Sequence, residues 1–85
     1  MAGNVAEPNI KEWVESLARD LVDHPEAVSV SSFEDEGVLV YELTVDPSEL
    51  GRVIGRQGRT VQAVRTLLEA AGARHDRYYE LEIIE

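Results

Sequence analysis

Two glycines, Gly55 and Gly58, are spaced Gly-x-x-Gly inside a stretch crowded with arginines. Glycine has no Cβ and accepts positive φ, so this spacing allows a sharp turn and lets another backbone approach closely. Apolar residues at helical spacing on both sides predict that the glycines join two helices, the second beginning at about Gly58. The unpaired N–H groups and the positive dipole end of that second helix would then face the turn. This chemistry favours an anion, such as a phosphate.

Three arginines, Arg52, Arg56 and Arg59, flank the same turn and add positive charge to it. The whole chain is acidic, with a net charge of −9 and a pI near 4.6, whereas nucleic-acid binders are usually basic. The charges are unevenly distributed, because residues 51–77 hold six arginines against two acids, and residues 1–50 hold two basic residues against twelve acids. Charges are screened over roughly 8 Å at physiological salt. A local cationic strip can therefore still bind a polyanion, with modest affinity.

The glycine turn also allows interpretations other than phosphate binding. A tight helix-helix connector without a ligand fits the glycines alone. A P-loop does not fit, because no lysine follows the glycines. A dinucleotide fingerprint fails because the glycines do not follow a strand in a βαβ unit. His24 and His75 lack partners at metal-ligand spacing, and the chain has no cysteine. We therefore expect no metal, no cofactor, no small-molecule substrate and no catalysis.

The length and composition fit one small domain. Residues 1–8 are expected to be a loose N-terminal tail, anchored at most by Val5, and residues 9–85 to form the domain. No apolar run is long enough for a membrane span, and the N-terminus lacks the apolar region of a signal peptide. The expectation is a cytoplasmic protein with no membrane contact.

The first element is predicted to be a helix over 10–22, with Asn9 as its N-cap and Pro25 after its end. Its apolar face would comprise Ile10, Trp13, Val14, Leu17, Ala18 and Leu21. Trp13 is expected to fill the core, and the alternative is partial exposure at a protein contact. Strands over 28–33 and 38–45 are expected to pair as an antiparallel hairpin around the acidic turn 34–37.

A short helix should start at Asp46-Pro47-Ser48-Glu49 and end at the glycine turn. A long helix follows, with an apolar face of Val61, Val64, Leu67, Leu68 and Ala71, and Gly72 is expected to close it. The final strand, over 78–84, alternates apolar and acidic residues. The order α-β-β-α-α-β predicts an α+β fold with one sheet and helices packed on one face.

The stretch from Val53 to Val61 matches the V-I-G-x-x-G-x-x-[IV] pattern of KH domains at every fixed position. In its element order the chain resembles the type II KH fold with a three-stranded sheet, and specifically the small bacterial single-KH proteins of the KhpA type, over residues 9–85. The resemblance implies that Gly55, Arg56, Gln57 and Gly58 clamp the backbone of single-stranded RNA. Val53, Ile54 and Val61 would line an adjacent apolar groove whose other side is a strand, and Arg52 and Arg59 would support the contact.

The function implied by this resemblance is non-catalytic RNA binding, as an RNA chaperone. Relatives of this type act with a second KH protein, of the KhpB type, in cell elongation and envelope homeostasis. The alternative is a protein-protein interaction module, a homodimer or heterodimer formed through a sheet edge or a helix, in which RNA contact is secondary. Tyr78, Tyr79 and the apolar last strand are suitable residues for such a contact.

Overall fold

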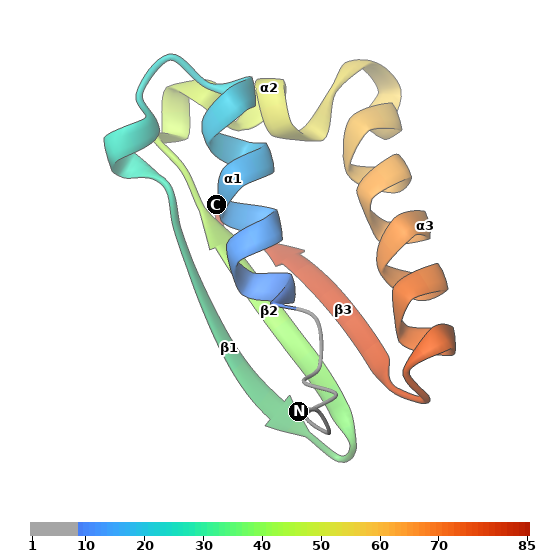
Figure 1. The fold of residues 1–85 in the computed structure, drawn as a ribbon. Helices are drawn as coiled ribbons and strands as arrows, with labels where there is room; N and C mark the ends of the chain where they lie inside the picture. Colours follow the sequence, from blue (N-terminus) through green and yellow to red (C-terminus); the bar gives the residue numbers. More distant parts are fainter. Residues whose placement is uncertain (1–8) are drawn as a thin grey trace.

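The computed structural model describes residues 9–85, so the expected tail over 1–8 lies outside the described residues. Its principal elements, in chain order, are α1 (Ile10–Leu21), β1 (Ser29–Asp35), β2 (Val38–Thr44), α2 (Leu50–Ile54), α3 (Arg59–Arg74) and β3 (Tyr78–Ile83). β2 is the central strand, antiparallel to β1 and parallel to β3. Figure 1 shows the helices on one face of this sheet. The predicted α+β fold and element order are confirmed.

The helix α1 begins as predicted, because the Asn9 side chain accepts a hydrogen bond from the Glu12 amide at 3.1 Å. It ends at Leu21, one residue before the predicted end. The prediction that Trp13 fills the core is wrong, since this residue is 39% exposed while Val14 beside it is buried. Trp13 lies instead on the side of α1 that borders a groove between α1 and α3.

The hairpin of β1 and β2 is tighter than predicted. Its turn is the pair Glu36 and Gly37, both with positive φ (52° and 86°), and Asp35 pairs directly with Val38. Two-residue turns with this backbone match the twist of the strands they join. Along β2, Tyr41 and Leu43 alternate with outward residues and are buried on the face that carries the helices.

Asp46 begins the segment that leads into α2, and its carboxylate accepts hydrogen bonds from the hydroxyl and the amide of Ser48. These two bonds hold the pKa of Asp46 below its ordinary value. Glu49, three residues further on, is only 5% exposed. Its carboxylate accepts the backbone N–H groups of Asp23 and His24. Glu49 therefore ties the start of α2 to the end of α1.

The prediction that Gly72 closes the long helix is wrong. α3 continues to Arg74, and the residue with positive φ that follows is Asp76 (57°). Gly72 is buried inside the last turns, where its carbonyl accepts the Arg77 amide at 2.8 Å. A Cβ at Gly72 would overlap the Arg77 carbonyl oxygen. Glycine is required at this position for close packing against the chain that enters β3, not for its φ.

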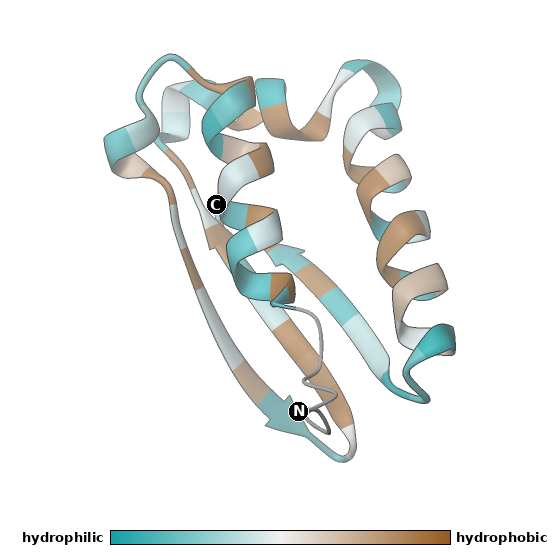
Figure 2. Cartoon of the chain, in the orientation of Figure 1, coloured by the Kyte–Doolittle hydropathy of each residue, from teal (hydrophilic) through white to brown (hydrophobic). Residues whose placement is uncertain are grey.

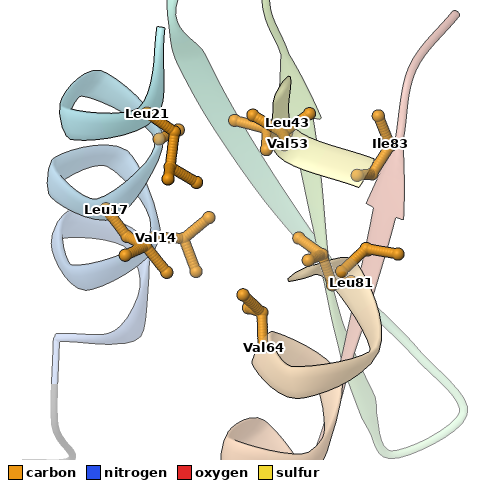
Figure 3. Close-up of a pocket in the computed structure, with 10 residues that line it drawn as sticks. Val14, Leu17, Leu21, Leu43, Val53, Val64, Leu81 and Ile83 are labelled. Atoms are coloured by element: carbon orange, nitrogen blue, oxygen red, sulfur yellow. The ribbon is translucent and has the colours of Figure 1, made fainter. Parts of the chain in front are cut away.

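The core lies between the helices and the sheet, where Figure 2 shows hydrophobic segments on α1, α3 and the strands facing one another. Figure 3 shows Val14 and Leu17 of α1 directed toward Val64 and Leu81 across this interior. The space left among these side chains is about 20 Å³ and is lined only by apolar residues. Such a cavity holds at most one water molecule and offers it no partner. It belongs to the core and is not a ligand site.

Two glycine substitutions should change stability in opposite directions. Gly72→Ala should lower the free energy of unfolding by about 1–3 kcal/mol, because the new methyl group is forced against the Arg77 backbone. Gly51→Ala should raise it by about 0.5–1 kcal/mol, because Gly51 is helical and nothing lies within 4 Å of the new Cβ. Urea unfolding measures both variants. Equal effects would contradict the packing role of Gly72.

Candidate nucleic-acid interface

The loop between α2 and α3 has a backbone that only glycine adopts easily at two positions. Gly55 has φ 80° and ψ 168°, and Gly58 has φ 74° and ψ 13°. The Gly55 amide bonds to the Gly51 carbonyl at 2.8 Å and the Gly58 amide to the Gly55 carbonyl at 3.0 Å. A Cβ at Gly55 would overlap Thr60, whereas a Cβ at Gly58 would have no other atom within 4 Å. The loop is a tight corner at the start of α3, as the glycine spacing predicted.

Gln57, between the glycines, also has positive φ (57°). Its side-chain oxygen accepts a hydrogen bond from the Arg59 guanidinium at 3.2 Å. Arg56, the other residue between the glycines, is exposed and pairs with no carboxylate of residues 9–85. The loop therefore presents one unpaired guanidinium and a second one held beside it by Gln57.

Arg52 differs from these two arginines. Its guanidinium lies 3.0 Å from the Asp23 carboxylate and 3.9 Å from the Glu49 carboxylate. Its charge is therefore largely compensated, and it helps to hold α2 against the end of α1. The cationic character of the loop rests mainly on Arg56 and Arg59.

An open groove of about 220 Å³ lies beside the loop, between α3 and the edge strand β3. Ile54 and Val61, two of the predicted groove residues, line it, together with Arg65, Ile83 and Glu85. The predicted contribution of a strand corresponds to Ile83 of β3. The third predicted residue, Val53, is 3% exposed and belongs to the core behind the groove.

The sequence interpretation missed Arg65, Ile83 and Glu85. Arg65 belongs to the cationic region that was noted, and the spacing Val61-x-x-x-Arg65 already placed it one helical turn beyond a groove residue. Ile83 and Glu85 could not be found in this way, because their position depends on the pairing of β3 with β2. The loop, Arg65 and the end of β3 together form a surface with a cationic corner and, beside it, a groove of apolar and charged residues.

Residues 9–85 contain neither a cluster suited to a metal ion nor a helix suited to a membrane span. Within residues 9–85, no three histidine or acidic side chains are grouped closely enough to hold a metal ion. None of the helices in this part has the length and apolarity needed to span a bilayer.

The fold and the loop are those of a type II KH domain. The family model "KhpA/KhpB, KH domain" matches residues 11–83. Proteins named RNA-binding protein KhpA are similar over 76 residues, which is 89% of this chain. The Aquifex aeolicus protein is 47% identical with 96% of its length covered, the Listeria monocytogenes EGD-e protein 45% with 100%, and the Chlamydia muridarum protein 38% with 97%.

This chain belongs to the KhpA/KhpB KH-domain family. The match covers α1 through β3, so the glycine loop and the groove lie in the shared part of the chain.

The positive φ of Gly58 predicts a graded response to substitution. Gly58→Val should lower the free energy of unfolding by about 1–3 kcal/mol, since a β-branched residue is strained in the left-handed region. Gly58→Asn should cost clearly less, because asparagine tolerates that region and the new Cβ meets no atom within 4 Å. Thermal and urea unfolding of the two variants give the comparison. Similar losses in both would show that φ is not the constraint.

Proposed function

We propose that this protein is a non-catalytic RNA-binding protein that clamps single-stranded RNA at the Gly55-Arg56-Gln57-Gly58 loop. The observation that carries this function is the loop corner, where two positive-φ glycines expose the backbone beside Arg56 and Arg59. A phosphate can approach such a corner closely, because Gly58 has no Cβ and the space where a Cβ would lie is open. The groove beside the loop is lined by the apolar residues Ile54, Val61 and Ile83, which can contact the bases, and by the charged residues Arg65 and Glu85.

The proposed mode of binding favours single strands over duplexes and gives a modest affinity. A loop that grips the backbone with bases in a groove cannot admit bases that are already paired. Because Arg52 is engaged with Asp23, two guanidinium groups rather than three are available to phosphates. The slope of log K against log salt for a single strand should then be about −1.4. Shallow salt dependence and weak charge attraction favour rapid release of the RNA.

The cellular role that we propose follows the family resemblance. Backbone contacts position a nucleic acid without reading its sequence, so many RNAs can be bound and released in turn, which suits an RNA chaperone. We propose that the protein acts in this way with a KhpB-type partner, in cell elongation and envelope homeostasis. The family name, which joins KhpA and KhpB, supports the partner.

The clamp is tested by replacing both Arg56 and Gln57 with aspartate. Two carboxylates in front of the α3 N-terminus repel a phosphate, so binding to a single-stranded RNA should fall at least tenfold. Both residues are exposed, so the unfolding free energy should change by no more than about 0.5 kcal/mol. The matched control is aspartate in place of Thr66 and Ala70, which are exposed further along α3.

The measurement is fluorescence anisotropy with a labelled single strand and the duplex of the same sequence, alongside thermal melting. The wild-type protein and the control should bind the single strand more tightly than the duplex. Retained binding by the folded loop variant, or equal affinity for the duplex, would refute the clamp.

A second candidate function is dimerisation, and the exposed apolar side chains favour it. Trp13 is 39% and Leu67 55% exposed, although sequence periodicity had placed both in buried faces. The two residues line one groove of about 410 Å³ between α1 and α3, with Ile10, Leu68 and Ala71. By contrast, Tyr79 of the last strand, which was expected to be available for a contact, is buried. We infer that another KH chain, either a second copy or a KhpB-type partner, packs on Trp13 and Leu67.

This surface predicts a specific effect of charge. If a dimer forms through it, Leu67→Asp should convert the dimer to a monomer, because a carboxylate would be buried in an apolar contact. Phe33→Asp is the matched control, since Phe33 is 46% exposed and lies on β1, away from that groove. Sedimentation of the two variants and the wild type measures the result. A monomeric wild type, or an unchanged Leu67→Asp dimer, would remove this candidate.

A further inference from the structure

Arg65 lies at the border of the groove, and two hydrogen bonds hold its guanidinium in one orientation. The residue projects from α3 and lines the groove with Ile54, Val61, Ile83 and Glu85, and it also lines the neighbouring hollow that contains Leu81. Its Nε and Nη2 atoms donate hydrogen bonds to the Leu81 carbonyl oxygen, at 3.3 and 3.1 Å. The side chain is exposed on its other side. It is therefore held by the strand and presented to any base that enters the groove.

The hydrogen bonds from Arg65 to the Leu81 carbonyl change which hydrogen-bonding groups the edge of β3 presents. The Ile84 amide bonds to the Leu43 carbonyl of β2, so the alternation along β3 directs the backbone groups of Leu81 and Ile83 away from β2. A free carbonyl at Leu81 would accept the amino group of a base. Arg65 occupies this acceptor and places hydrogen-bond donors there instead.

The remaining donors of Arg65 form a fork. A guanidinium has five N–H groups in a fixed plane, and the Leu81 carbonyl uses two of them. Nη1 makes no hydrogen bond within residues 9–85. The pair of parallel N–H groups on Nη1 and Nη2 fits a base with two adjacent acceptors. Guanine offers the adjacent acceptors O6 and N7, and cytosine offers O2 and N3. Adenine instead has an amino donor beside its acceptors. In uracil, N3–H lies between the two carbonyl oxygens.

We propose that Arg65 makes the groove selective for a guanine or a cytosine over adenine and uracil. This inference rests on the proposed RNA-binding function and adds a base preference to it. The loop residues contact the RNA backbone and supply affinity for any sequence. Arg65 supplies discrimination at one position, and its fixed bonds to Leu81 mean that the fork is already oriented before a base arrives.

The test uses four single-stranded RNAs of the form 5′-UUXXUU, where X is A, C, G or U. The wild-type protein should bind the G or the C strand about tenfold more tightly than the A and U strands. Arg65→Lys keeps the charge and loses the fork. Its preference among the four strands should fall to within twofold. Arg74→Lys is the matched control, because Arg74 is exposed at the end of the same helix, and it should keep the preference.

A strand with 7-deazaguanine repeats the test on the unchanged protein, because it removes N7 and leaves O6. Tight binding of the G strand that weakens with 7-deazaguanine assigns the guanine edge, and tight binding of the C strand alone assigns cytosine. Equal binding of all four strands, or a preference that survives in folded Arg65→Lys, overturns the inference and leaves RNA binding intact. Absence of binding to every strand would instead overturn the proposed function, and the selectivity with it.

Discussion

The parallel pairing of β2 with β3 is the constraint on which the rest of the structure depends. Two neighbouring strands that run in the same direction need a crossover of a dozen or more residues, and here residues 45–77 form it. The crossover contains α2, the glycine loop and α3. The loop is the corner at which the chain turns from α2 into α3 (Figure 1). The same pairing brings Ile83 of β3 beside Ile54 and Val61 to form the groove.

The buried carboxylate of Glu49 fixes the start of this crossover. By accepting the amides of Asp23 and His24 it joins α2 to the end of α1, and Arg52 completes the contact by bridging to Asp23. Arg52 therefore has a structural role, and Arg56 and Arg59 are the arginines that place positive charge at the loop. This distribution explains how a chain with a net charge of −9 can carry a local site for a polyanion.

The elements and the loop were predictable because local signals specify them. Asn9, the Asp46-Pro47 pair and the Gly55–Gly58 spacing each act through their immediate neighbours. The failures all depend on tertiary packing. Gly72 has the type of a helix terminator, yet its role is set by the approach of Arg77. Trp13 and Leu67 fit the helical period but line the groove between α1 and α3, which no other element of residues 9–85 fills. The groove residues Ile83 and Glu85 required knowledge of the strand pairing.

The most direct test of the central claim is to map RNA contacts by recording ¹H–¹⁵N correlation spectra of the protein during titration with a short single-stranded RNA. The account predicts that the largest amide shifts fall on Gly55, Arg56, Gln57 and Gly58, followed by the groove residues of α3 and β3. The amides of β1, on the far edge of the sheet, should remain unchanged. Largest shifts on β1, or around Trp13 and Leu67 with an unaffected glycine loop, would contradict it.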